Sequence, residues 1–194
     1  MNKAFLIFLL IGQTLFYSCN TNHDKVTFCY NNYKKARDLA YNNPYKPASL
    51  DSALIIVNKC MQCDSIKPAI IDLKLRLLIT LNKLREGSEF INSLPPSDFT
   101  YAYQKSLYQD GLIARNFESI KDTINRDKVY KRMAVDLCSY IANKNLESKE
   151  FHEAFTELSA IPRNSIDSIS LIHFIDSLKI KYPNEERFLD FYQH

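Results

Sequence analysis

The chain has 194 residues, a formal net charge of +3 and 24% charged residues. Acidic and basic groups are interspersed along it, so we expect no phosphate-binding track and no nucleic-acid partner. Only three glycines are present. Phosphate-cradling loops depend on glycines that let the backbone approach a ligand, and the sequence therefore excludes a glycine-rich nucleotide-binding motif.

The first segment of the chain has the composition of a secretion signal. Lys3 gives a positive start, and an apolar stretch follows that is shorter than a membrane span. This stretch ends in Phe16-Tyr17-Ser18-Cys19, which resembles the lipobox of bacterial lipoproteins, where a small residue precedes the lipidated cysteine. Ser18 matches that pattern, whereas Phe16 and Tyr17 depart from it.

The resemblance implies that residues 1–18 are a cleaved signal peptide and that Cys19 carries the lipid. Residues 19–25 would then form a polar tether and residues 26–194 a helical domain. The protein would be held by palmitate-type chains on a membrane of the bacterial cell envelope, with the outer membrane favoured. Two alternatives stay open: an ordinary cleaved signal beside a coincidental cysteine, and an uncleaved anchor.

Beyond the tether, apolar residues recur at three- and four-residue spacing, which predicts amphipathic helices. The expected helices cover residues 25–41, 47–60, 68–81, 85–94, a fifth beginning at a Ser97-Asp98 cap, 122–144, 148–161 and 165–181, with a short last one near Phe188 and Phe191. All seven prolines lie between these stretches or at the first residue of one, and none lies inside. The sequence therefore predicts an all-α fold of about eight helices in antiparallel pairs.

A faint repeat runs through these helices. Small residues at Ala53, Gly87 and Ala154 are separated by 34 and 67 residues, close to one and two periods of 34. Seven positions after each comes an apolar residue or a cysteine, and proline follows directly at two of them. This spacing is similar to that of the tetratricopeptide repeat family, in which such a small residue lets paired helices pack closely.

The resemblance to tetratricopeptide repeats implies a short solenoid. Its second helices would be those over 47–60, 85–94 and 148–161, each preceded by its partner. The chain lacks the tryptophan and the first-helix Leu-Gly signature of the family, and the stretch from Phe99 to Lys121 is irregular. The alternative is an irregular helical bundle whose spacings agree by chance.

The cysteines other than Cys19 offer several chemistries. Cys60 and Cys63 have the spacing of a redox motif, but no strand precedes them, so a local disulfide or plain buried thiols are the structural alternatives. Cys29 and Cys138 complete an even set. The four histidines are unrelated in spacing, and no metal or other cofactor is expected.

Candidate recognition residues lie off the apolar stripes. Tyr101 and Tyr108 combine an aromatic ring with a polar tip that suits binding. The repeat resemblance places Asp72, Arg76 and Lys83 on the concave side, where a groove would form. The alternative for the tyrosines is an ordinary solvated position on a helix.

Together these patterns predict a lipid-anchored, non-catalytic module that binds another protein or an extended peptide. The sequence shows no nucleophile elbow and no paired acid–base motif, so we expect no enzyme activity. A second hypothesis is an immunity-type or inhibitor lipoprotein whose rigid helical face blocks one specific partner protein. A third is an enzyme with an unrecognised helical active site.

Overall fold

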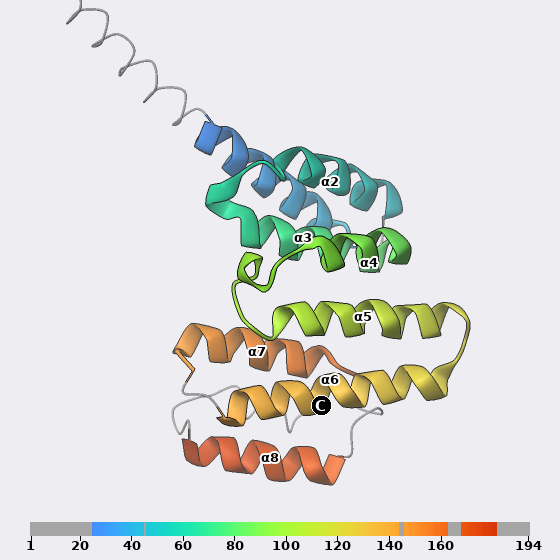
Figure 1. Cartoon of the computed structure of the whole chain (residues 1–194), viewed down its shortest axis with the longest axis vertical. Helices are drawn as coiled ribbons and strands as arrows, with labels where there is room; N and C mark the ends of the chain where they lie inside the picture. Colours follow the sequence, from blue (N-terminus) through green and yellow to red (C-terminus); the bar gives the residue numbers. More distant parts are fainter. Residues whose placement is uncertain (1–24, 45, 144–145, 163–167, 182–194) are drawn as a thin grey trace, which may run out of the picture. The chain divides into compact units, whose positions relative to one another are not determined.

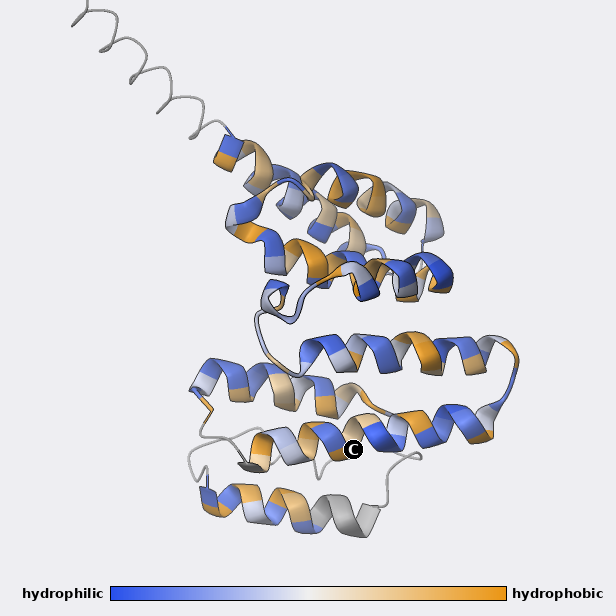
Figure 2. Cartoon of the chain, in the orientation of Figure 1, coloured by the Kyte–Doolittle hydropathy of each residue, from blue (hydrophilic) through white to orange (hydrophobic). Residues whose placement is uncertain are grey.

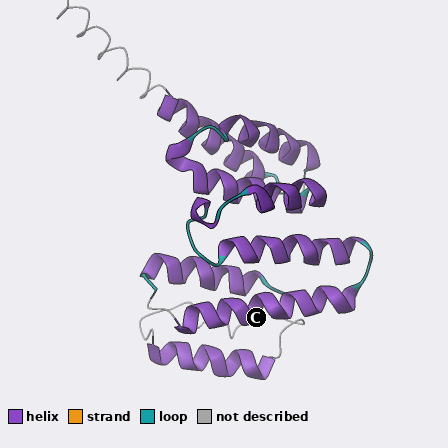
Figure 3. Cartoon of the chain, viewed as in Figure 1, coloured by secondary structure: helices purple, strands orange, loops and turns teal. Residues whose placement is uncertain are grey.

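The computed structural model describes residues 25–44, 46–143, 146–162 and 168–181. These residues form eight α-helices and no strand, which confirms the predicted all-α class. Figure 3 shows the helices and the loops that join them. The signal segment with Cys19, and the short helix expected near Phe188 and Phe191, lie outside the described residues.

The helices divide between two compact units, one ending at Lys83 and the other beginning at Leu84. The N-terminal unit contains a first helix over residues 25–42, α2 (Pro47–Cys60), the 3₁₀ turn η1 (Asp64–Ile66) and α3 (Lys67–Thr80). The C-terminal unit contains α4 (Leu84–Ser93), the 3₁₀ turn η2 (Pro96–Asp98), α5 (Gln104–Ser119), α6 (Thr123–Asn143), α7 (Ser148–Ala160) and α8 (Ser168–Lys181). Figure 1 shows both sets of helices in sequence colours.

One predicted helix start is wrong. We expected the fifth helix to begin at a Ser97-Asp98 cap, but α5 begins at Gln104. Pro96–Asp98 forms only a 3₁₀ turn, and Phe99 returns to extended backbone with ψ of 146°. The backbone N–H groups of Asp98 and Phe99 donate within the turn, to the carbonyls of Pro95 and Pro96. The cap pattern therefore encoded a turn rather than a helix.

The N-terminal unit has an aliphatic core. In α3, buried side chains occur on several sides of the helix, as the wide apolar stripe predicted, and α2 packs against it. Figure 2 shows hydrophobic and hydrophilic residues alternating along the helices, as amphipathic packing requires. The buried residues of this unit are Cys29, Ala36, Ala40, Leu50, Ala53, Leu54, Val57, Cys60, Cys63, Ile70, Ile71, Leu73, Leu75, Leu77 and Leu78.

The C-terminal unit has a partly aromatic core. Neighbouring helices α5, α6 and α7 pack side by side in Figure 1, and the described side chains of α8 include the buried Ile175 and Leu178. Asp110 of α5 is buried and accepts two hydrogen bonds from the guanidinium of Arg132 on α6, one of them 3.0 Å long from Nε. The core comprises Tyr103, Leu107, Ala114, Val129, Met133, Ala134, Leu137, Ile141, Phe151, Ala154, Phe155, Leu158, Ile161, Ile175 and Leu178.

Two helices end on residues with left-handed backbone, although neither is glycine. Asn82 after α3 has φ of 57° and Lys121 after α5 has φ of 60°. In each case the backbone N–H of the following residue donates to the carbonyl oxygen five residues earlier. The N–H of Lys83 bonds to the Leu78 oxygen at 2.9 Å, and that of Asp122 bonds to the Phe117 oxygen at 2.9 Å. These are Schellman caps, which normally favour glycine because a Cβ is strained there. The chain thus ends two helices sharply without using its scarce glycines.

The repeated small residues are all buried at helix-packing positions. Ala53, Gly87 and Ala154 lie inside α2, α4 and α7. A Cβ at Gly87 would come within 2.6 Å of Leu112 Cδ2 on α5, so α4 and α5 approach too closely for a larger residue. The residues four and seven positions later are buried as well: Val57, Cys60, Ile91, Leu94, Leu158 and Ile161. The three helices therefore share one packing pattern.

Candidate binding surfaces

The charged residues expected in a groove lie in the N-terminal unit and pair locally. Arg76 donates from Nε to Asp72 Oδ2 at 3.1 Å across one turn of α3. Lys83 Nζ lies 2.7 Å from Asp51 Oδ1 of α2. Both pairs are partly exposed, where such contacts contribute only about 0–1 kcal/mol to stability. Asp72 and Arg76 share a face of α3, whereas Lys83 joins the end of that helix to α2.

A tyrosine of the first helix lies within electrostatic reach of the α3 pair. Burial raises the pKa of Tyr33, and the charges of Asp72 and the Tyr41 phenol raise it further, while Arg37 and Arg76 lower it. No pattern in the sequence indicates this interaction, because it joins residues of two different helices.

Both tyrosines expected in a groove lie in the C-terminal unit, but one is buried and the other is at the surface. Tyr108 is only 5% exposed and belongs to the buried face of α5, so the prediction that it lines a binding groove is wrong. The reason is that α5 buries both Leu107 and Tyr108, a wider face than one apolar stripe indicates. Tyr101 is half-buried and remains at the surface.

Tyr101 is part of a cluster of three tyrosine rings. It stacks on Tyr103 with ring centroids 5.8 Å apart, and Tyr103 meets Tyr140 of α6 edge to face at 5.0 Å. The Tyr101 N–H donates to Gln104 Oε1 at 3.0 Å, which holds the segment against the start of α5. A backbone hydrogen bond links Ala102 to the Tyr140 hydroxyl. Loop and helix therefore hold the rings together.

Carboxylates of α7 and its N-terminal flank surround this cluster. Glu147, Glu150, Glu153 and Glu157 recur at three- and four-residue spacing, which places them on one side of the helix. The Tyr140 hydroxyl donates to Glu150 Oε1. Burial raises the pKa of Tyr101, and the charges of Glu153, Glu150 and Glu147 add to that shift. We call these three rings and four carboxylates the Tyr–Glu surface.

The hydroxyl of Tyr103 is the polar group of this surface that lacks a partner. Tyr103 is 7% exposed, and its hydroxyl makes no hydrogen bond. Burial raises the pKa of Tyr103, and the charges of Glu157 and Glu153 add to that shift. The ring also lines a cavity of about 10 Å³, which holds one water molecule at most and no larger ligand.

Sequence analysis missed most of the Tyr–Glu surface. Of its members, only Tyr101 was among the candidate binding residues predicted from the sequence. The three-three-four spacing of the glutamates was the available signal, because it puts four acids on one helix face. The position of that face beside the tyrosines depends on how α5, α6 and α7 pack.

The disulfide of this protein joins other cysteines than the expected local pair of Cys60 and Cys63. Cys63 is bonded to Cys29 of the first helix, with their Cα atoms 5.9 Å apart, and Cys60 is a buried free thiol. The candidate Cys60–Cys63 disulfide is therefore wrong. Cys60 is the last residue of α2 and belongs to its buried face, whereas Cys63 follows the turn and reaches the first helix.

The free thiols are poorly suited to nucleophilic chemistry. Burial raises the pKa of Cys60, and it raises the pKa of Cys138 to about 12. A thiol with a raised pKa carries little thiolate at neutral pH, and the thiolate is the reactive form. Among the described residues there is also no cluster of three or more metal-binding side chains.

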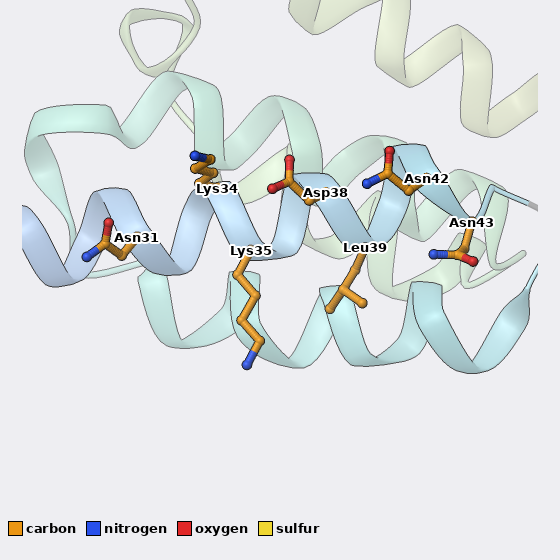
Figure 4. Close-up of a pocket in the computed structure, with 7 residues that line it drawn as sticks. All are labelled: Asn31, Lys34, Lys35, Asp38, Leu39, Asn42 and Asn43. Atoms are coloured by element: carbon orange, nitrogen blue, oxygen red, sulfur yellow. The ribbon is translucent and has the colours of Figure 1, made fainter.

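A broad depression lies along the exposed side of the first helix (Figure 4). Its volume is about 400 Å³, and its described lining comes from this single helix: Asn31, Lys34, Lys35, Asp38, Leu39, Asn42 and Asn43. Asp38 lies 3.5 Å from Arg37 in an exposed ion pair. The lining combines three asparagines and Leu39 with two lysines and one aspartate, so it carries charges of both signs.

No helix in the described part of the chain has both the length and the apolar character needed to cross a bilayer. Comparison with known proteins adds no relative: no protein-family model, no curated protein and no solved structure matches the chain.

Proposed function

We propose that this protein is a lipid-anchored component of the bacterial cell envelope whose helices form a tetratricopeptide-like scaffold that binds another protein or peptide. It holds its partner by equilibrium binding and makes or breaks no covalent bond. The lipid on Cys19 confines this binding to a membrane surface. The observation that carries the proposal is the packing pattern shared by α2, α4 and α7.

The shared pattern supports a repeat scaffold for a physical reason. A small buried residue lets the neighbouring helix approach, and the residues four and seven positions later continue the same packing face. Repeat folds use such units to build extended surfaces for binding polypeptides. Exposed aromatic and charged side chains on both units, such as Tyr30 at 58% exposure, supply contacts of the kind that interfaces favour.

The anchor is tested by changing Cys19→Ala. The wild type should incorporate a clickable palmitate analogue and sediment with membranes, whereas the variant should lose the label and move to the soluble fraction. Cys138→Ala is the matched control and should change neither result. Unchanged labelling and sedimentation of the Cys19→Ala protein would contradict the anchor.

The binding role is tested by crosslinking in intact cells. A photo-crosslinking residue is placed at Tyr30 in the N-terminal unit or at Tyr101 in the C-terminal unit, and adducts are identified by mass spectrometry. A defined adduct with one protein at either position, competed by excess unmodified chain, is the expected result. Absence of any competed adduct from several surface positions on both units would count against the proposal.

A further inference from the structure

The first helix carries the excess positive charge of the chain beyond the signal segment. Residues 25–42 contain four basic side chains and one acidic side chain, which gives this helix a net charge of +3. Residues 43–194 contain 20 basic and 20 acidic side chains and are therefore neutral overall. The excess charge thus lies on the helix that directly follows the proposed tether.

Three lysines of this helix are left without an acidic partner. Lys25, Lys34 and Lys35 are exposed, and no ion pair among the described residues includes any of them. The fourth basic group, Arg37, lies 3.5 Å from Asp38, the one acid of the helix. The charge of the three lysines is therefore available to an anion from outside the unit.

An exposed aromatic ring shares a side of the helix with two of these lysines. Phe28, which is 49% exposed, follows Lys25 by three residues and precedes Lys35 by seven, or about two helical turns. Lys35 also lines the depression in Figure 4, whose described lining comes from this helix alone. Lysines beside an exposed apolar ring are typical of helices that lie at a membrane surface, where the ring meets the acyl boundary and the ammonium groups meet the headgroups.

The chain between the proposed lipid and this helix is short. Lys25 is six residues beyond Cys19, and a chain spans at most about 3.6 Å per residue, so any conformation keeps the helix start within roughly 22 Å of the lipidated residue. A lipid on Cys19 therefore holds the lysines at a high local concentration beside the headgroups. Their attraction to anionic lipid acts over about 8–10 Å at ordinary ionic strength.

We propose that the exposed side of the first helix binds the anionic lipid headgroups of the membrane to which the protein is anchored. The inference rests on the proposed function, because the lipid on Cys19 brings the helix to that membrane. Tyr30 lies about 140° around the helix from Lys35, so this contact leaves it available to the partner protein. The residues that contact the membrane are Lys25, Phe28, Lys34 and Lys35.

A tryptophan introduced at position 28 reports on this contact alone, because the chain has no tryptophan of its own. The full-length lipidated protein with Phe28→Trp is reconstituted in vesicles of phosphatidylcholine, or of equal parts phosphatidylcholine and phosphatidylglycerol, and quenching by brominated lipid is measured. Quenching is expected in the anionic vesicles and should disappear at about 1 M salt, where the screening length falls to about 3 Å. The matched control is Ile55→Trp, at a position of α2 that is 58% exposed, and it should be quenched equally in both kinds of vesicle.

The role of the charges is tested with Lys34→Gln and Lys35→Gln together in the Phe28→Trp protein. Each lysine near an anionic surface changes the ratio of bound to free helix about fivefold, so the pair should lower that ratio roughly twentyfold. The matched control is Lys46→Gln with Lys59→Gln, which removes the same charge from exposed positions of the same unit. It should change the ratio by less than about twofold, because more distant charges are screened.

Two results would overturn the inference and leave the anchor standing: equal quenching at position 28 in both kinds of vesicle, or an equal loss in the two lysine variants. Charge-dependent quenching of a protein without lipid on Cys19 would support the membrane contact and contradict the anchor.

A crosslinking experiment in intact cells separates lipid from protein as the occupant of this surface. Asn31 is exposed and lies between Phe28 and Lys35 on the same side of the helix. A photo-crosslinking residue placed there should form adducts with phospholipid. A defined, competed adduct with one protein at this position would overturn the membrane contact and support the proposed binding role.

Discussion

The cores of the two compact units are built from different kinds of side chain. Among the described residues, the buried core of the N-terminal unit contains no aromatic side chain, and a disulfide joins its first helix to the segment after α2. The C-terminal unit buries Tyr103, Phe151 and Phe155 and contains a free thiol at Cys138. The N-terminal unit therefore has an aliphatic core and a disulfide crosslink, whereas the core of the C-terminal unit contains large aromatic side chains.

The difference follows from the area that each core removes from water. An aromatic side chain buries about 150–250 Å², far more than an alanine or a cysteine, and apolar burial stabilises by about 25 cal/mol per Å². A small aliphatic core gains less from burial and benefits more from a crosslink that restricts the unfolded chain. We therefore expect truncation of a ring to damage the C-terminal unit most and loss of the disulfide to damage the N-terminal unit most.

The largest effect is expected from Phe151→Ala. Phe151 is fully buried and stacks on Phe155 with ring centroids 5.8 Å apart. Removing such a ring leaves a cavity and should lower the free energy of unfolding of the C-terminal unit by about 3–5 kcal/mol. Urea unfolding followed by hydrogen exchange with mass spectrometry measures this unit by unit. Equal loss of protection in both units would contradict their separate cores.

The next largest effect is expected from Cys63→Ser, which opens the disulfide to Cys29. The bond closes a separation of 34 residues, for which the chain-entropy model gives about 3–4 kcal/mol. That loss should fall on the N-terminal unit and should be reproduced by reducing the wild type. Cys60→Ala is the control, and it should keep the disulfide in non-reducing peptide mapping. A peptide linking Cys60 to Cys63 in the wild type would refute the Cys29–Cys63 bond.

A smaller change in stability is expected from Gly87→Ala, and a second substitution should reverse its sign. Gly87→Ala brings a Cβ against buried Leu112, an overpacking cost of about 1–3 kcal/mol that exceeds the gain of about 1 kcal/mol in helix propensity. We expect a net loss of about 1 kcal/mol. In a Leu112→Ala background the space is open, and the same change should stabilise the C-terminal unit. Thermal unfolding of the four proteins of this cycle measures the reversal.

The smallest effect is a stabilisation by Lys121→Gly. Lys121 has φ of 60°, where a side chain costs about 1–2 kcal/mol, and glycine removes that strain but adds about 0.5–1 kcal/mol of chain entropy to the unfolded state. The net gain should be roughly 0.5–1 kcal/mol in the C-terminal unit. Asn82→Gly is the comparison in the N-terminal unit and should gain less, because asparagine tolerates this backbone better. A loss of stability in Lys121→Gly would contradict the strain at this cap.

Some of the candidate binding residues were accessible from the sequence and others were not. Asp72, Arg76 and Tyr101 were predicted at the surface, and all three are partly exposed. Tyr108 was placed there too but is buried, because off-stripe position in one helix does not reveal whether a second helix covers it. The Tyr103 hydroxyl and its neighbouring glutamates come from separate elements, and no local pattern shows that they meet.

The sequence by itself determined most of the helices, but not the start of α5, since apolar spacing and proline positions act within a few residues of the backbone. It placed α2 at its observed bounds and α7 within one residue, and it identified the small positions Ala53, Gly87 and Ala154 that are buried in the structure. Only the tertiary structure decided that Cys63 bonds to Cys29, that Tyr108 is covered, and that three tyrosines lie beside the acids of α7. These features join residues far apart along the chain, and their partners depend on how whole helices pack.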